Sequence, residues 1–221
     1  MLTTDLTRPY PELHHMAADG SWPSIQRHGL LSTAALVEKW QVVEPGIRSS
    51  LLEQRREESR VLKHPMHAAA VIRDQKPIHE PSLGEALDGM TVGQWYEVLS
   101  ARVFFFLQRE RLEGLLNARS YTKDSHTVIT IDTANFVAAH EREIELCAIN
   151  SGFAQRHSKA RRGLETFQSI GDYRHRAREA RRTCAPWDVA ELCVPGGVRD
   201  IGDHIIRVEW MRGDEILERI V

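Results

Sequence analysis

Glu191 is the residue whose surroundings most strongly suggest chemistry. It lies in the middle of an apolar run, Val189-Ala190-Glu191-Leu192-Cys193-Val194, where a buried charge without a partner is costly. Strand alternation offers an ordinary explanation, because Ala190, Leu192 and Val194 would share one face and Glu191 would point outward from the other. Alternation alone therefore favours an outward residue, and only a cleft or a partner would give Glu191 a catalytic role.

Arg73 and Asn150 are two further polar residues that follow apolar segments. Arg73 comes directly after Val71-Ile72 and, taken alone, is expected to be a solvated loop residue. Asn150-Ser151-Gly152 has the residue types of a turn. Neither position indicates a function by itself.

The segment 155–182 is strongly basic, with nine Lys or Arg residues against three acidic ones. Aromatic residues and histidines are interleaved with the arginines, so the segment could follow a phosphate backbone and stack on bases. A solvated, Arg-rich helix is the more common explanation of such a run. The candidate nucleic-acid contacts are Arg161, Arg162, Arg181 and Arg182.

The histidines and cysteines lack the spacing of a metal centre. His140-Glu141 has no second histidine to complete a zinc-protease helix, and Pro65 disfavours a helix that would bring His64 and His67 together. No base is implied near Cys193, and no Gly-rich loop precedes a helix. The sequence therefore predicts no metal, no cysteine nucleophile and no P-loop.

The composition is that of an ordinary globular protein. The chain has 221 residues, a formal net charge of -2, 42% hydrophobic and 27% charged residues, which excludes a disordered chain and a histone-like DNA binder. Without a repeat or linker, this length predicts one domain over residues 1–221. No apolar run approaches the roughly 20 residues of a membrane span, no secretory signal is visible, and three cysteines are an odd number. We expect a cytoplasmic protein with no membrane contact.

Capping patterns and β-branched runs predict the elements that must position these residues. Ser21 and Pro23 begin a helix that Gly29 ends. Further helices are expected at 32–40, 47–63 and 109–116. Capping boxes at 82–85 and 91–94 each predict the start of another helix, and Thr133 is expected to cap a helix that ends near His140. Strands are expected at 103–107, 126–132, 189–194 and 204–210, with 13–16 as a strand or a loop edge. This irregular mixture predicts an α+β fold.

Taken in order, three blocks of the sequence resemble the DarT-type and related PARP-like ADP-ribosyltransferases. The first is Leu13-His14-His15-Met16-Ala17 followed by a short helix that ends in Gly29-Leu30. The second is Val71-Ile72-Arg73-Asp74 ahead of the apolar strand at 103–106. The third is the strand that contains Glu191, which resembles the strand of the family's catalytic glutamate. The segment 15–33 is most similar in its residues to an uncharacterised bacterial branch; it reads HMAADGSWPSIQRHGLLST.

This resemblance implies a fold and a set of site residues. The fold would be a single α+β domain built on the split mixed β-sheet of ADP-ribosyltransferases, with flanking helices. Glu191 and Arg73 would be catalytic, and Ala17 stands where the family usually has threonine. The residues expected to bind NAD are His15, Gly29, Leu30, Ser32, Arg73 and Asn150.

The activity implied by the resemblance is transfer of ADP-ribose from NAD, the co-substrate, with release of nicotinamide and no metal. The acceptor stays open between a DNA base, an RNA end and a protein side chain, and the basic segment 155–182 favours single-stranded DNA or RNA. The alternatives are a catalytically inert NAD- or nucleotide-binding module and an RNA 2′-phosphotransferase-like enzyme. A toxin-like enzyme of this kind would have an antitoxin-like partner, which the sequence does not identify.

Overall fold

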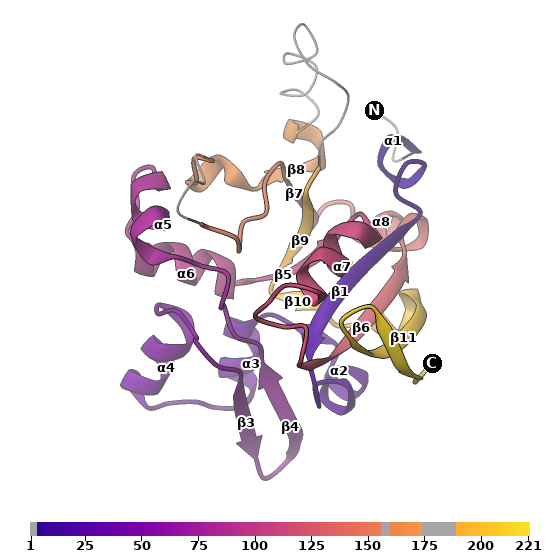
Figure 1. Ribbon diagram of the computed structural model, residues 1–221, viewed down its shortest axis with the longest axis horizontal. Coiled ribbons are helices and arrows are strands. Elements are labelled where there is room, and N and C mark those ends of the chain that lie inside the picture. Colours follow the sequence, from indigo (N-terminus) through magenta and orange to yellow (C-terminus); the bar gives the residue numbers. More distant parts are fainter. Residues whose placement is uncertain (1–3, 156–159, 174–188) are drawn as a thin grey trace, which may run out of the picture.

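One eight-stranded antiparallel sheet organises the fold (Figure 1). The computed structural model describes residues 4–155, 160–173 and 189–221. The strand order is β12-β11-β6-β1-β5-β9-β7-β8, so strands from both ends of the chain become neighbours. The strand bounds are Glu12–Ala18 for β1, Arg102–Phe106 for β5, Ser125–Asp132 for β6, Glu145–Cys147 for β7, Gln168–Ser169 for β8, Glu191–Pro195 for β9, Ile205–Arg212 for β11 and Glu215–Arg219 for β12.

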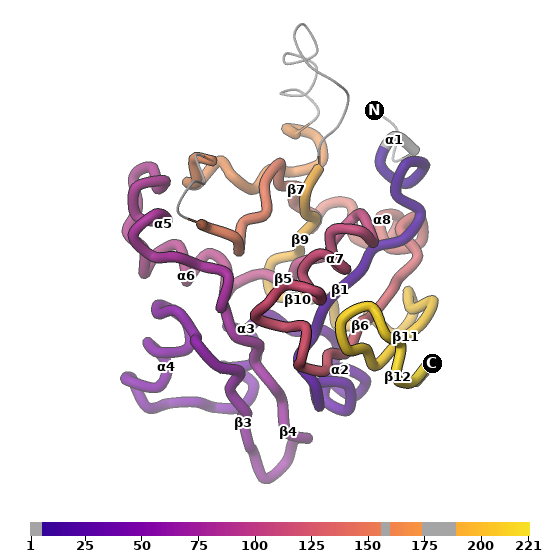
Figure 2. Tube along the Cα trace, in the orientation of Figure 1, coloured from indigo at the N-terminus to yellow at the C-terminus, as the bar shows by residue number. Residues whose placement is uncertain are grey.

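Two small sheets accompany the large one. Strand β2 (Leu30–Leu31) pairs with β10 (Gly197–Val198), and β3 (Arg60–His64) pairs with β4 (His67–Ile72). The β3–β4 hairpin extends from one end of the molecule, at the bottom of Figures 1 and 2.

The helices surround this framework. Their bounds are Thr4–Thr7 for α1, Trp22–His28 for α2, Thr33–Lys39 for α3, Pro45–Leu52 for α4, Glu80–Ala86 for α5, Val92–Ser100 for α6, Arg109–Leu116 for α7 and Thr133–His140 for α8, with short 3-10 helices η1 (Leu164–Thr166) and η2 (Ile201–His204). Helices α3, α4, α5 and α6 form a connected group, whereas α1 packs against α8. Among the helices of the described residues, none combines the length and apolar character needed to cross a membrane.

The α+β class is confirmed, but the expectation of a mixed sheet is wrong. Every strand pairing within the described residues is antiparallel. The reason is the placement of β1: the strands β5 and β6, which are connected through α7, do not pair with each other but flank β1 from either side. A crossover connection such as the one through α7 gives a parallel pair only when the two strands that it joins are neighbours, and here β1 lies between them.

The sheet is continuous, yet it opens at one place. Strands β1 and β5 form a single ladder pair, His14 opposite Phe106, although the two strands extend to Ala18 and Arg102. In contrast, β1 pairs with β6 along its whole length. Strands β1 and β5 therefore separate beyond one ladder pair, within a sheet that stays continuous.

The largest hydrophobic cluster lies on one face of the large sheet, and a smaller one packs α7 against neighbouring positions of β1 and β6. The central strands contribute Leu13, Phe105, Ile129, Leu192 and Val208, none of which is exposed to solvent. Helix α8 supplies further apolar side chains to the same cluster. Met16 of β1 and Val128 of β6 belong to the second cluster, so both faces of the sheet are buried at these strands.

The expected strands at 103–107, 126–132, 189–194 and 204–210 correspond to β5, β6, β9 and β11. The helix predicted at 47–63 is wrong in its second half. Helix α4 ends at Leu52, and residues 60–64 form β3 instead. A continued helix would have left Leu62 on an exposed surface, whereas pairing with β4 buries it beside Leu51 in a common apolar cluster. The gain from this tertiary packing overrides the helical preference of the charged residues.

Ser21 and Ser32 are the N-caps of α2 and α3 as predicted, whereas two other predicted helix starts are displaced. The capping box of Thr91 and Gln94 forms both of its hydrogen bonds. The box predicted at Ser82 does not begin a helix, because His79 is the cap of α5 and Pro81 occupies its first turn. Asp132, rather than Thr133, caps α8 by accepting a hydrogen bond from the Asn135 N–H.

Gly29 allows the chain after α2 to approach the C-terminal segment closely. Its φ is 82°, and a Cβ atom built there would lie 2.5 Å from Arg199 Cα. Next to this contact, Leu30 pairs with Val198 and Leu31 with Gly197. The position therefore requires glycine for its backbone conformation and for space.

We expect Gly29→Ala to lower the free energy of unfolding by at least about 1–2 kcal/mol, since it adds a left-handed alanine and a backbone clash. Gly114→Ala is the control, because Gly114 lies inside α7 with no atom within 4 Å of the added Cβ. This change should stabilise the protein by about 0.5–1 kcal/mol. Urea unfolding of both variants measures the difference, and equal stability would contradict the role given to Gly29.

Candidate functional site

A cleft lies where β1 and β5 separate. Its volume is about 210 Å³, and its walls come from β1, the segment from α2 to α3, the end of β4, β5, the loop 150–153 and β9. All of the residues predicted for catalysis and NAD binding line this cleft, namely His15, Gly29, Leu30, Ser32, Arg73, Asn150 and Glu191. The structure thus brings together positions that are spread from 15 to 191 in the sequence.

His15 bridges the opening between the two strands. Its Nδ1 lies 2.8 Å from the carbonyl oxygen of Phe104. Because a carbonyl oxygen can only accept, Nδ1 must donate, and Nε2 of the neutral ring remains an acceptor. Burial lowers the pKa of His15 to about 4, and nearby Arg73 adds to this effect against the opposing Phe104 hydrogen bond. His15 is therefore neutral at neutral pH and suited to accept a hydrogen bond from a hydroxyl group.

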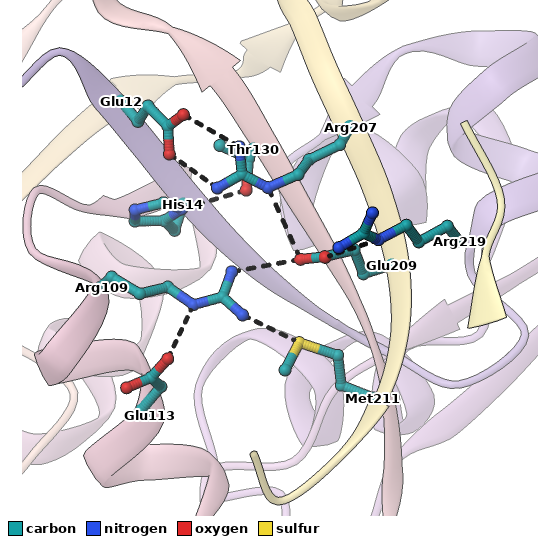
Figure 3. A network of polar contacts seen from close by, with 9 residues as sticks. All are labelled: Glu12, His14, Arg109, Glu113, Thr130, Arg207, Glu209, Met211 and Arg219. Carbon is teal, nitrogen blue, oxygen red and sulfur yellow. Dashed lines mark hydrogen bonds and ion pairs between the residues drawn. The ribbon is translucent and has the colours of Figure 1, made fainter. Parts of the chain in front are cut away.

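The adjacent His14 belongs to a different environment on the other face of β1, shown in Figure 3. Its Nδ1 lies 3.1 Å from Thr130 Oγ1. In the same network Arg207 holds Glu12 with two hydrogen bonds of 2.9 and 2.6 Å. Three arginines surround the buried carboxylate of Glu209, namely Arg109, Arg207 and Arg219. The network joins β1, β6, β11 and α7, so His14 serves the sheet rather than the cleft.

Arg73 brings an unsatisfied donor to the cleft. Its Nη1 is buried and has no hydrogen-bond partner, and of the described residues that line the cleft it is the one with such an atom. The guanidinium carbon lies 5.8 Å from the centre of the Tyr121 ring. A buried donor without a partner costs about 1–3 kcal/mol, which an anionic ligand would recover.

A second arginine holds the backbone of Arg73 in place. Arg56 is 8% exposed; its Nε donates to the Arg73 carbonyl at 3.1 Å, and its Nη1 donates to the Leu51 carbonyl at 2.5 Å. Burial lowers the pKa of Arg56 to about 10, with Arg73 contributing, so the group stays protonated at neutral pH. On the other side, Asp74 accepts a hydrogen bond of 2.5 Å from the Tyr121 hydroxyl. The residues flanking Arg73 are thereby fixed.

Glu191 is buried, contrary to the outward position that alternation favoured. It is 5% exposed, and its Oε2 accepts hydrogen bonds from the Ser151 N–H at 2.9 Å and the Ser151 hydroxyl at 2.6 Å. Burial raises the pKa of Glu191, while Ser151 and the positive charges of Arg73 and Arg162 oppose this rise. Alternation failed here because both faces of β9 are covered: Leu192 faces the main core and Cys193 a second apolar cluster.

Arg162 positions the loop that covers Glu191. It is 2% exposed, and its guanidinium donates to the carbonyls of Ala160 at 2.7 Å and Phe153 at 2.6 Å. The prediction that Arg162 contacts nucleic acid is therefore not supported, because burial and these bonds keep its charge from a phosphate backbone. Sequence reasoning missed this role, and Ser151 as well, because the partners of both residues are defined only in the folded chain.

The other arginines of the basic segment differ from Arg162. Arg161 is exposed and forms an ion pair with Asp88, to which its Nε donates at 3.0 Å. Arg181 and Arg182 lie outside the described residues. Arg161 is thus the one predicted nucleic-acid contact that the described part of the chain places on the surface.

The remaining predicted residues shape the cleft wall. The Ser32 oxygen caps α3 by accepting from the Ala35 N–H at 3.2 Å, and Leu30 is 3% exposed. Asn150 precedes Ser151 in the loop held by Arg162. Burial raises the pKa of Cys147 to about 12 and also raises the pKa of Cys193, so neither of these two thiols is a nucleophile at neutral pH.

No curated protein matches the chain. A family model does match, over residues 11–205, and its description is "Family of unknown function (DUF7002)". The matched region contains β1, the loop at 150–153, β9 and every residue of the cleft described above. The chain therefore belongs to the DUF7002 family.

Proposed function

We propose that the protein is an NAD-dependent ADP-ribosyltransferase. The observation that carries the proposal is that His15, Arg73 and Glu191 line one cleft. Together they offer a neutral imidazole, a cation with an unsatisfied donor and a buried carboxylate. These are the groups needed to bind a ribose hydroxyl, to bind a pyrophosphate and to act on the sugar carbon.

In this reaction the bond between the nicotinamide nitrogen and ribose C1′ breaks, and C1′ forms a bond to the acceptor. The electron pair of the broken bond leaves with nicotinamide, which departs as a neutral molecule, and the acceptor loses a proton. Positive charge develops on the ribose as in glycoside hydrolysis, and a nearby carboxylate stabilises it. Glu191 supplies that carboxylate and can also receive the acceptor's proton.

The other two residues bind the substrate. The planar guanidinium of Arg73 matches two phosphate oxygens better than a lysine would, and its buried Nη1 has no competing partner among the described residues. His15 accepts a hydrogen bond from a ribose hydroxyl through Nε2, because Nδ1 is already bonded to Phe104. A pyrophosphate at Arg73 would place the sugar between this arginine and Glu191.

The acceptor we favour is a nucleic acid, a preference that now depends on Arg161 rather than on the whole basic segment. Incubation of the protein with labelled NAD and a panel of DNA, RNA and protein tests this choice, since label on one class identifies the acceptor. The alternative, an inert nucleotide-binding module, would bind NAD without releasing nicotinamide.

We expect Glu191→Gln to reduce nicotinamide release by about 10²–10⁴-fold, the range typical of one electrostatic or acid–base group. NAD affinity should change little, because the binding contacts belong to Arg73 and His15. Calorimetry with NAD and a turnover assay on the same sample separate the two effects.

The matched control is Glu218→Gln, which alters an exposed glutamate of β12 that does not line the cleft. It should leave turnover and NAD affinity unchanged. A folded Glu191→Gln protein with wild-type turnover would remove Glu191 from the mechanism.

Ser151→Ala should move the acidic limb of the rate profile to higher pH. Glu191 must be ionised to act, burial raises its pKa, and the Ser151 hydroxyl opposes that rise by stabilising the carboxylate. Removing the hydroxyl therefore raises the pKa further, so activity is lost at a higher pH as the solution is acidified. The kcat/KM profile measures this shift, with the exposed Ser50→Ala as control, and identical profiles would contradict the prediction.

Arg161→Gln should weaken binding of single-stranded DNA or RNA and reduce the salt dependence of that binding by about one ion. The free energy of unfolding should change by no more than about 0.5 kcal/mol, since exposed ion pairs such as Arg161–Asp88 contribute little to stability. Fluorescence anisotropy at several salt concentrations measures the effect, with the exposed Arg219→Gln as control. Equal binding by both variants would exclude Arg161 from the contact.

A further inference from the structure

Two histidines and an aspartate gather between α8 and η2, outside the cleft. They are His140, at the end of α8, Asp200, just before η2, and His204, the last residue of η2. One ligand atom from each lies within 4.8 Å of the others. None of the three lines the cleft, so the cluster is separate from the proposed active site.

The two ring nitrogens of His140 each face a carboxylate. Its Nδ1 lies 3.2 Å from Glu143 Oε2, and its Nε2 lies 3.1 Å from the Asp200 carboxylate. A neutral imidazole carries one N–H and can donate to only one of these acceptors. When Nδ1 donates to Glu143, the Nε2 lone pair faces the carboxylate, and only a second proton or a cation makes that approach favourable.

His204 approaches the same carboxylate in a drier environment. Its side chain is 3% exposed, and both ring nitrogens are buried without a hydrogen-bond partner. Its Nε2 lies 3.5 Å from the same Asp200 carboxylate. Two imidazoles thus approach one carboxylate, and a single divalent cation would replace the two protons otherwise needed.

We propose that His140, Asp200 and His204 bind a zinc ion through His140 Nε2, His204 Nε2 and the Asp200 carboxylate. In a tetrahedral zinc site with bonds of about 2.0 Å, neighbouring ligand atoms are about 3.3 Å apart, close to the 3.1 and 3.5 Å separations here. Two imidazoles and one carboxylate suit zinc better than magnesium or calcium, which take oxygen ligands. Asp200 is partly exposed, so water can complete the tetrahedron.

Glu143 is the outer partner of this site. Histidine ligands usually donate their second ring N–H to a carboxylate or carbonyl, which fixes the tautomer that binds the metal. The contact of His140 Nδ1 with Glu143 has this arrangement. The sequence predicted no metal because the ligands stand at positions 140, 200 and 204, a separation that no short motif contains.

The ion would fasten the C-terminal segment that packs behind the cleft wall at residues 29–31. Asp200 follows Arg199, whose backbone abuts Gly29, and β10 just before it pairs with β2. Bonds from the ion to both α8 and η2 would hold this segment against the sheet. The site is therefore structural, and its loss should reduce stability more directly than turnover.

Zinc titration of the chelator-treated protein tests the proposal. We expect one Zn²⁺ per chain by calorimetry, and at 100 times Kd a rise in thermal midpoint of about 5–10 °C. Mg²⁺ and Ca²⁺ should produce no rise. Co²⁺ in place of Zn²⁺ should lack a sulfur charge-transfer band, which excludes binding by a cysteine.

Asp200→Asn and His140→Gln should each weaken Zn²⁺ binding at least 10-fold, and Glu143→Gln should weaken it about 10–100-fold through the outer shell. Asp203→Asn is the matched control, since Asp203 is an exposed acid in the same turn outside the cluster. It should bind zinc as the wild type does. Absence of one-to-one binding by the wild type, a sulfur band with Co²⁺, or equal affinities for Asp200→Asn and Asp203→Asn would overturn the proposal.

Discussion

The separation of β1 from β5 is the constraint on which the rest of the structure depends. With His14 and Phe106 as their one ladder pair, the backbone groups beyond it need other partners, because unpaired buried polar groups are costly. His15 provides the partner for the Phe104 carbonyl. This hydrogen bond gives the Phe104 carbonyl a partner where the strands separate, and it also fixes the tautomer of His15, which lines the cleft. The opening and the chemistry of His15 therefore have one physical origin.

Buried arginines then determine the electrostatics of the cleft. Arg56 and Arg162 bind backbone carbonyls on opposite sides, so they fix the segments that carry Arg73 and Ser151. Their charges remain inside the protein, where screening by water and salt is weak. Arg162 and Arg73 both favour the ionised form of Glu191 against the effect of burial. Of these two arginines, Arg73 lines the cleft and Arg162 does not.

The C-terminal segment at Gly197–Arg199 supports one wall of the cleft through close backbone contact with residues 29–32. Gly29 and Gly197 both have positive φ and both lie where an added Cβ would meet the opposite chain. This contact holds Leu30 and Ser32 in the wall, and the His140–Asp200–His204 cluster lies at the far end of the same segment. The cleft wall at Leu30 and Ser32 is thus supported from behind by a close backbone contact and by the apolar packing of Leu30 and Val198.

Local sequence features determined the elements, and tertiary structure determined the environment of each polar residue. The strand at 126–132, the capping box of Thr91 and the turn at Gly29 could be predicted because their causes lie within a few residues. The set of cleft residues was accessible only through the resemblance of ordered motifs. Burial of Glu191, the structural role of Arg162 and the strand at 60–64 could not be predicted, because each depends on partners far away in the chain. Alternation reports the two faces of a strand, but what covers each face is decided by the assembled fold.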